Sequence, residues 1–424
     1  MDRTKAPAYK EIDNINFINP QLKKLNNGLE LIVFKTGSQE IVKIELILDA
    51  GIIKQNKNLI ASTTNTMLQE GSKGFTAEEI AEELDFYGSH LSLSIDKDFA
   101  KVTFFSLEKH LEKGLKIVLD IIQYPTFPQK KLDRYLSKRL QSFKLDMEKV
   151  KDLASRKFTQ ELFGKNHPYG SVAELSDFSN ISRQDLIDFF ETYYQPSNCK
   201  MVIAGQFSNE ALVRIEDSFS AWKNSDKKIL SSENFVPPKL ETLDFLIEKK
   251  DAMQSGLRLG KILFNRTHED YAKMQVVNTL LGGYFGSRLM KNIREDKGYT
   301  YGIGSALISQ KETGYLTIVS EVNASVSKET INEINKEIKI LQTELVSESE
   351  LAKVKSYMLG RLLRAVDGPF ALSDTYLNVY LYGMDWDYYR KYIKTIREIT
   401  SEEIMQLCQR YLKVESLIKV IVGK

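Results

Sequence analysis

The sequence predicts an α+β protein made of two homologous domains, each a mainly antiparallel sheet with helices packed on one face. Two observations predict this fold class. Segments of the first half recur in the second half, and strand-like and helix-like patterns follow the same order within each half. With 424 residues, of which 42% are hydrophobic, the chain is long enough to fill a core in each half.

The internal repeat consists of five short segments that occur in the same order at a nearly constant offset, a little over half the chain. The matched pairs are Leu31 with Leu246, Asn65-Thr66-Met67-Leu68 with Asn278-Thr279-Leu280-Leu281, 100–106 with 314–320, 181–186 with 399–404, and 203–205 with 421–423. Each match alone is weak, and any two α/β domains share some such patterns. Five matches in one order are hard to obtain by chance and favour a duplication.

The stretch between the two repeats predicts the domain boundaries. It contains charged residues, Ser231-Ser232 and Pro237-Pro238, and adjacent prolines interrupt both helix and sheet. We therefore expect an N-terminal domain over 1–223, a linker over 224–242 and a C-terminal domain over 243–424, each of ordinary domain size.

Within the first half, the apolar residues Ile44, Leu46 and Leu48 alternate along 43–49, which predicts a half-buried strand. A buried helix is expected over 59–68, a strand over 102–105, and an amphipathic helix over 107–122. The second half repeats this order, with a buried helix over 271–281, a strand over 316–319 and a helix over 331–341. Longer helices are predicted over 129–163 and 348–365.

Composition excludes several classes of protein. The 59 basic and 57 acidic residues give a net charge of +2, which argues against a nucleic-acid binder. No apolar run approaches the ~18 residues that span a bilayer, and the N-terminal residues contain no apolar signal segment. We therefore expect a soluble, cytoplasmic chain. Two cysteines, Cys199 and Cys408, are too few for a disulfide framework, and we expect them to be small buried residues.

A search for catalytic motifs finds neither a phosphate-binding Walker loop nor a G-x-S-x-G elbow. The chain has only four histidines, no two of which lie within a helical turn or two of each other, so no metal site is predicted. His167 lies in the turn-like string Asn166-His167-Pro168-Tyr169-Gly170, where a structural role is expected.

The most informative segment is 281–301, LGGYFGSRLMKNIREDKGYTY. Gly298 is expected to end a helix, with Arg294 on its last turns and Tyr301 on the strand that follows. Two donors placed in this way could converge on a carbonyl oxygen and stabilise an oxyanion. The residues alone favour a solvated arginine and an interfacial tyrosine over this arrangement.

At this point the sequence resembles the pitrilysin/insulinase-like zinc metallopeptidases, the inverzincins, over nearly its whole length. The resemblance rests on the duplicated halves, on 282–289 (GGYFGSRL), on 293–301 (IREDKGYTY) and on 167–170 (HPYG). In that family, the first half carries H-x-x-E-H. Its two histidines and a later glutamate bind zinc, and its own glutamate activates water. The second half carries an arginine and a tyrosine that contact the scissile carbonyl.

This chain departs from the family pattern at the metal site. Aligned on the neighbouring alanine and Met-Leu, the two histidine positions are Ser62 and Thr66, and the general-base position is Asn65. The third ligand is also missing, because no glutamate occurs between Glu112 and Glu148. Neutral hydroxyls are poor zinc ligands and an amide cannot abstract a proton. The departure implies that this chain binds no metal or other cofactor.

Arg294 and Tyr301, by contrast, stand at the spacing that the family uses. Some members work as pairs in which one subunit has the zinc motif and the other has the Arg/Tyr pair, and this chain resembles the second kind. The resemblance implies a zinc-free subunit, not a peptidase alone, that closes over a homologous H-x-x-E-H subunit holding the zinc. Arg294 and Tyr301 would then bind the carbonyl of an unfolded peptide substrate and stabilise the oxyanion.

Two points stay open at this stage. Gly282, Gly283 and Gly286 resemble the glycine-containing loop with which the non-catalytic subunit of the mitochondrial enzyme captures substrate, but the loop is shorter here, and a helix–helix turn, which explains all three without a ligand, is favoured. The alternative function is a non-proteolytic structural or peptide-binding scaffold of the same fold. One form of it is a homodimer, formed when the chain is isolated, that binds an extended peptide at a sheet edge.

Overall fold

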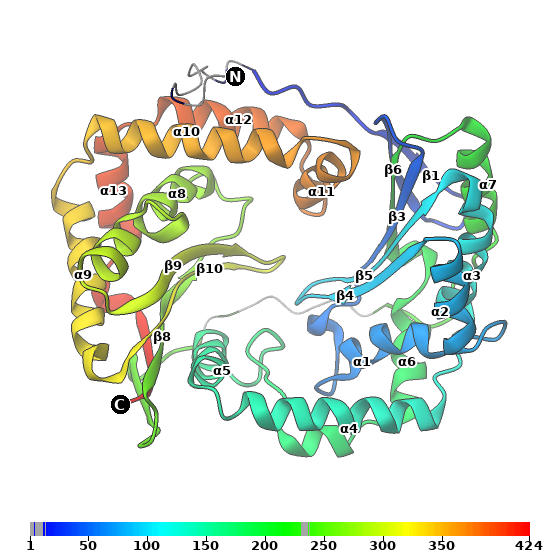
Figure 1. Cartoon of the computed structure of the whole chain (residues 1–424), viewed down its shortest axis with the longest axis horizontal. Helices are drawn as coiled ribbons and strands as arrows, with labels where there is room; N and C mark the ends of the chain where they lie inside the picture. The colour runs from blue at the N-terminus through cyan, green and yellow to red at the C-terminus, as the bar shows by residue number, and fades with distance from the viewer. Residues whose placement is uncertain (1–3, 5–11, 13, 230–235, 237) are drawn as a thin grey trace.

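The computed structural model describes residues 4, 12, 14–229, 236 and 238–424. Parts of the predicted linker, including Ser231-Ser232 and Pro237, lie outside the described residues. Figure 1 shows the first half on the right and the second half on the left, each with its own sheet. The hairpins β4–β5 and β9–β10 point toward each other between the two halves.

The first half contains a six-stranded sheet in the order β1-β2-β6-β3-β5-β4, in which only the β2–β6 pair is parallel. Its strands are β1 Gln21–Lys24, β2 Glu30–Lys35, β3 Ile41–Leu48, β4 His90–Ile95, β5 Ala100–Leu107 and β6 Cys199–Gly205. Its helices are α1 Ile60–Met67, α2 Ala77–Phe86, α3 Leu111–Gln123, α4 Gln129–Asp146, α5 Val150–Phe163, α6 Arg183–Tyr193 and α7 Asn209–Ser220.

The second half contains a five-stranded sheet in the order β7-β11-β8-β10-β9, in which only the β7–β11 pair is parallel. Its strands are β7 Asp244–Glu248, β8 Gln254–Leu263, β9 Thr300–Ser309, β10 Gly314–Asn323 and β11 Ile418–Gly423. Its helices are α8 Tyr271–Asn278, the π-helical turns η6 Thr279–Gly283 and η7 Met290–Asp296, α9 Ser327–Thr343, α10 Glu348–Ala365, α11 Pro369–Tyr380, α12 Trp386–Glu398 and α13 Ser401–Tyr411.

The two sheets have the same topology once β1 is set aside. Strands β2, β6, β3, β5 and β4 correspond in order to β7, β11, β8, β10 and β9. The sequence matches fall on corresponding elements, for example 100–106 on β5 with 314–320 on β10, and 203–205 on β6 with 421–423 on β11. The predicted fold class, two homologous α+β domains with mainly antiparallel sheets, is confirmed.

Each half also contains one helix that packs against the sheet of the other half. Helix α5 packs on β8 and β11, where Phe158 and Leu162 contact Val420 and its neighbours. Helix α11 packs on β2 and β6 of the first sheet, where Leu372 and Tyr376 join a separate apolar cluster. The two halves therefore share parts of their cores (Figure 1).

This exchange changes two local predictions. Strand β3 is buried along nearly its whole length and not on one face only, because α11 covers its second face. Even Lys43 and Glu45 of this strand are buried and pair with each other, and Lys43 also pairs with Asp374 of α11. The helical stretch predicted over 129–163 is divided at 147–149 into α4 and α5, because α5 must turn away to reach the other sheet.

Candidate functional site

Helix α1 contains the three positions that the sequence predicts to correspond to two zinc ligands and the general base of catalytic relatives. Ser62 and Thr66, four residues apart, are half-exposed, whereas Asn65 is buried. The Asn65 amide donates to the Ser94 carbonyl of β4 at 2.9 Å, and its oxygen accepts from the Tyr194 hydroxyl at 3.0 Å. Both ends of a buried amide are thereby satisfied, so Asn65 joins α1 to the sheet edge and to the core.

A guanidinium group lies beside the first of these positions. Arg139, on α4, donates through Nη1 to the Ser62 hydroxyl at 2.9 Å and to the Tyr135 hydroxyl at 2.8 Å. Ser62 in turn donates to the Leu59 carbonyl at 3.1 Å, so its hydroxyl orientation is fixed. Sequence reasoning missed Arg139, because nothing in the spacing between α1 and α4 indicates this contact.

These residues do not fit a zinc ion. Zinc needs thiolate, imidazole or carboxylate ligands, and here the ligand positions hold two hydroxyls with a permanent positive charge hydrogen-bonded to one of them. Across the described part of the chain, no group of three or more His, Cys, Asp or Glu side chains is placed to hold a metal ion.

The second candidate region lies where η7 meets β9. Gly298 adopts a φ of +65°, as expected of a residue that ends a helix, and the Tyr299 amide donates to the Ile293 carbonyl at 3.0 Å. The turn places Arg294 and Tyr301 on adjoining segments. The Arg294 guanidinium stacks over the ring of Phe285, 4.8 Å from its centroid, and this ring is 65% exposed.

Tyr301 lies on a β-bulge at the open edge of the second sheet. Thr300 pairs with Val322 and Ile303 with Ser320, so Tyr301 and Gly302 together face the single residue Glu321. The Thr300 hydroxyl accepts from the Gly302 amide at 3.1 Å and donates to the Glu321 carbonyl, which fixes the bulge. A bulge redirects a side chain, and Tyr301 is 92% exposed.

Tyr301 also lines a cleft of about 900 Å³ between the start of α5 and the second sheet. The cleft is lined by charged side chains, among them Glu148, Lys151 and Lys249, and by Tyr299 and the 87% exposed Met253. An extended chain segment with mixed side chains could lie here beside the tyrosine. Within the described residues, neither Arg294 nor Tyr301 has a hydrogen-bond partner for its side chain.

The glycines near this region are required by packing. A Cβ on Gly282 would lie 2.6 Å from the Ser305 amide nitrogen of β9, and one on Gly283 would lie 3.0 Å from the Asn278 amide group. A Cβ on Gly286 would meet the Tyr284 ring at 2.8 Å. Close approach thus explains each glycine without a ligand, and a substrate-binding role for them stays a prediction.

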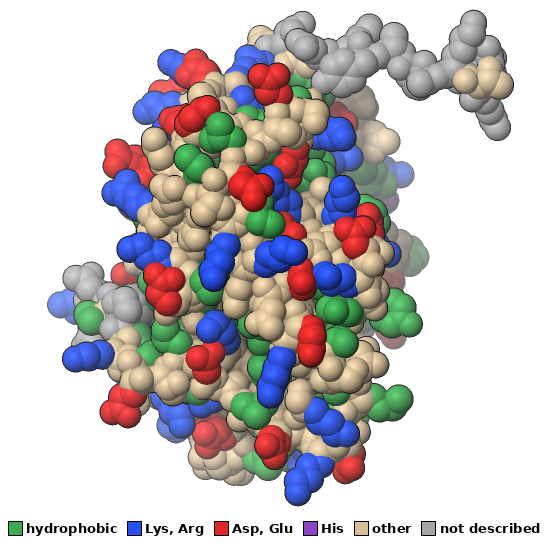
Figure 2. All heavy atoms as spheres, turned by 90° about the vertical axis from the view of Figure 1, so that its left-hand side faces the viewer, with side chains coloured by type: hydrophobic (Ala, Val, Ile, Leu, Met, Phe, Trp, Pro, Cys, Tyr) green, Lys and Arg blue, Asp and Glu red, His purple; other side chains and the backbone are tan. Residues whose placement is uncertain are grey.

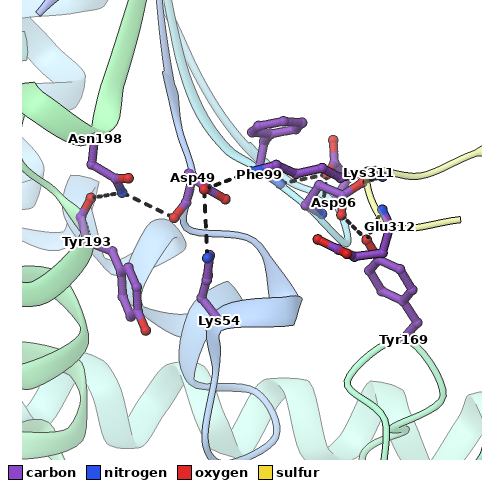
Figure 3. Close-up of polar contacts among 10 residues, drawn as sticks. Asp49, Lys54, Asp96, Phe99, Tyr169, Tyr193, Asn198, Lys311 and Glu312 are labelled. Atoms are coloured by element: carbon purple, nitrogen blue, oxygen red, sulfur yellow. Dashed lines mark hydrogen bonds and ion pairs between the residues drawn. The ribbon is translucent and has the colours of Figure 1, made fainter. Parts of the chain in front are cut away.

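Tyr169 of the HPYG string lies at a junction between the two halves, beside Lys311 and Glu312 of the second half (Figure 3). Tyr169 is fully buried, and its hydroxyl donates to the buried Asp98 carboxylate at the tip of the β4–β5 hairpin. From the β9–β10 hairpin, the Lys311 amide donates to the other Asp98 oxygen at 2.9 Å, and its ammonium pairs with Asp49 at 3.0 Å. This contact between hairpins was not foreseen from the sequence.

Burial dominates the electrostatics of the junction. It raises the pKa of Asp98, although the Tyr169 hydroxyl and the Lys311 amide oppose this shift. It lowers the pKa of Lys97, whose ammonium donates to the Tyr169 carbonyl at 2.9 Å, to about 8. His167 accepts from the Tyr169 amide at 3.1 Å, in keeping with its expected structural role.

The remaining predicted features lie apart from these regions. Cys199 and Cys408 are free and buried, and burial raises the pKa of both thiols. In the part of the chain that the structure describes, no helix is long and apolar enough to cross a membrane. Figure 2 shows acidic and basic side chains interspersed on the outer face of the second half.

Comparison with known proteins matches two family models. The model "Insulinase (Peptidase family M16)" covers residues 31–169, and "Peptidase M16 inactive domain" covers residues 180–358. An "Uncharacterized zinc protease" of Rickettsia bellii is 27% identical, with 92% of this chain and 91% of that protein covered. A "Non-peptidase homolog YmxG" of Helicobacter pylori is 23% identical, with 87% and 85% covered.

Among solved structures, the "peptidase M16 inactive domain" from Pseudomonas fluorescens matches with a TM-score of 0.85 and 24% identity, covering 96% of this chain and 98% of that one. This likeness shows a shared fold. Together with the family models, it places both halves and their helices within one architecture. The chain belongs to the insulinase (peptidase M16) family, and its sequence contains no H-x-x-E-H motif.

Proposed function

We propose that this chain is a catalytically incomplete, zinc-free subunit that pairs with a homologous H-x-x-E-H subunit and supplies Arg294 and Tyr301 to a shared active site. The proposal rests on one asymmetry. Ser62, at a metal position, and Asn65, at the general-base position, are bonded within the chain, whereas Arg294 and Tyr301 are exposed and have no hydrogen-bond partner in the described chain.

The chemistry of the pair follows from its donors. A guanidinium and a phenol hydroxyl directed at one carbonyl oxygen stabilise the negative charge that develops when water attacks the carbonyl carbon. Stacking on Phe285 restrains the Arg294 guanidinium without using its hydrogen-bond donors. The bulge holds Tyr301 away from its own sheet. In this proposal, zinc and the general base belong to the partner subunit.

The direct test uses the assembled pair and an unfolded peptide substrate. Arg294→Gln and Tyr301→Phe should each lower kcat by roughly 10²–10³-fold, the range for removing one oxyanion donor, with the pair still assembled on size exclusion. Arg214→Gln, at an exposed position of α7, and Tyr124→Phe, at a 54% exposed ring, are the matched controls. Unchanged turnover in both site variants would rule out the catalytic role.

The isolated chain offers a second test. It should neither hold stoichiometric zinc nor cleave the peptide by itself. Cleavage by this chain alone, with zinc bound, would contradict the assignment of zinc and the general base to the partner subunit.

A peptide-binding scaffold without proteolytic role is the second candidate, and strand β4 favours it. This strand is the last of the first sheet, so one backbone edge is unpaired, and its residues alternate between exposed and half-exposed. Such an edge can pair with an extended peptide or with a second copy of the chain. A homodimer that binds peptide, together with failure to assemble with any H-x-x-E-H chain from the same cell, would favour this candidate.

A further inference from the structure

One edge of the Arg139 guanidinium, formed by Nε and Nη2, has no hydrogen-bond acceptor among the described residues. Its Nη1 atom donates to the hydroxyls of Ser62 and Tyr135, which uses both hydrogens of that nitrogen. The Nε–H and Nη2–H groups have no acceptor among the described residues, and no carboxylate of that part of the chain lies within ion-pair distance. These two nitrogens form the side-on fork that matches the two oxygens of a carboxylate.

Arg288 of the same chain shows what this fork does when a carboxylate is present. Its Nε donates to Glu350 Oε1 at 2.8 Å and its Nη2 donates to Glu350 Oε2 at 2.8 Å. Arg139 is half-buried, as Arg288 is, so its charge is partly desolvated. A half-buried guanidinium that has neutral partners on one edge only can bind an anion through its other edge.

The surroundings hold the fork in one orientation. Ser62 is fixed by its own bond to the Leu59 carbonyl, and the Tyr135 ring lies beneath the guanidinium at 5.8 Å. Ser62 and Thr66 form the half-exposed face of α1, and Asn65 of that helix is bonded to the edge strand β4. A peptide paired with the open edge of β4 would pass close to α1 and could bring a carboxylate to Arg139.

We infer that the metal position of the first half has become a carboxylate-binding site, in which Arg139 holds a peptide carboxylate through its Nε and Nη2 atoms. The positive charge that zinc supplies in catalytic relatives is here a fixed guanidinium, so the site binds an anion and carries out no hydrolysis. The carboxylate comes either from the end of a peptide chain or from an Asp or Glu side chain. This inference does not depend on a partner subunit or on Arg294 and Tyr301.

The test measures binding of N-acetylated, unlabelled ten-residue Ser/Ala peptides to the purified full chain by isothermal titration calorimetry. One peptide ends in a free carboxylate, the second is amidated, and the third is amidated with one internal glutamate. The wild type should bind one or both carboxylate-bearing peptides roughly tenfold more tightly than the neutral amide, and added salt should reduce this difference. A preference for the first peptide alone identifies a chain terminus, and equal binding of the first and third identifies any carboxylate.

The variants separate the fork from charge in general. Arg139→Gln should abolish the tenfold preference, and Arg139→Lys, which keeps the charge without the fork, should retain only a small part of it. Arg134→Gln, at an exposed position of the same helix, is the control and should leave the preference intact. Thermal melts of each variant check that the fold is intact. Equal binding of all three peptides to the wild type, or a full preference in folded Arg139→Gln, would overturn the inference.

Discussion

The α1 side and the η7–β9 side of the molecule differ in what satisfies their polar side chains. On the α1 side, Asn65 is bonded at both ends within the chain, and Ser62 joins the Arg139 guanidinium to α1. On the other side, Arg294 rests on an exposed ring and Tyr301 is 92% exposed. The buried amide of Asn65 is thus satisfied within the fold, whereas exposed donors remain available to another molecule.

The bonds of Ser62 and Asn65 join α1 to α4 and β4, so their loss should alter stability or anion binding. Interactions at Arg294 and Tyr301 contribute little to the fold, so their loss should alter what the chain does to a bound peptide.

Restoring two metal ligands tests whether Arg139 opposes a cation. Ser62→His with Thr66→His places two imidazoles four residues apart on the half-exposed face of α1, a spacing that can bind zinc. Adding Arg139→Gln should tighten zinc binding roughly a hundredfold or more, because two unit charges about 4 Å apart already repel by ~4 kcal/mol at an effective dielectric constant of about 20 before screening, and zinc carries two charges. Competition with a chelating dye measures the affinity.

The control for this comparison is Arg134→Gln in the same two-histidine background, which removes an exposed charge from the same helix. It should leave the zinc affinity nearly unchanged. If Arg139→Gln also has no effect, then the guanidinium lies too far from the two histidine positions to matter, and the contrast between the two sides loses its electrostatic basis.

Tyr169→Phe tests the junction that joins the two sides. Removing the hydroxyl takes one donor from the buried Asp98 carboxylate and one acceptor from the Glu312 amide. The free energy of unfolding should fall by about 2 kcal/mol, the usual cost of losing a hydrogen bond to a charged group. Urea denaturation measures it, and Tyr124→Phe is the matched exposed control. Equal stability of the two variants would mean that the junction contributes nothing.

Lys97 predicts a pH dependence of the same junction. Its pKa is about 8 in the folded chain, against 10.5 for a lysine in the unfolded chain. Between these pH values the unfolded chain binds more protons, so this group makes stability rise with pH over that interval. The wild type should gain stability relative to Lys97→Met from pH 8 to 10.5 in parallel urea titrations. A constant difference would show that Lys97 titrates normally.

Patterns that are local in the sequence predicted much of the fold and of the second candidate region. Residues near one another in sequence determine the strand and helix patterns within each copy of the repeat. They also determine helix α10 over Glu348–Ala365 and the Gly298 turn between Arg294 and Tyr301. Periodicity and capping report such short-range interactions well.

The features missed by sequence reasoning depend on distant contacts. Arg139 and Ser62 are 77 positions apart, and Lys43 and Asp374 are 331 apart. The bulge at Tyr301 depends on how β9 pairs with β10, which alternation of side chains does not reveal. The absence of an H-x-x-E-H motif can be seen in the sequence. The position of the Arg139 guanidinium beside Ser62 cannot, because it depends on how α4 packs on α1.

Replacement of Phe285 should have the smallest effect on the activity of the assembled pair. The ring stacks on Arg294 and, as a hydrocarbon, donates no hydrogen bond to a substrate carbonyl. Phe285→Leu should therefore lower kcat/KM of the assembled pair by only about two- to fivefold, corresponding to an exposed cation–π contact of ~0.5–1 kcal/mol. Phe86→Leu, at an 81% exposed ring of the first half, should have no effect. A loss as large as that of Arg294→Gln would mean that the ring itself contacts the peptide. Stacking only restrains the donor, so the loss of kcat/KM should be largest for Arg294→Gln, small for Phe285→Leu and absent for Phe86→Leu. This order would distinguish an oxyanion donor held in position by a ring from a general apolar surface.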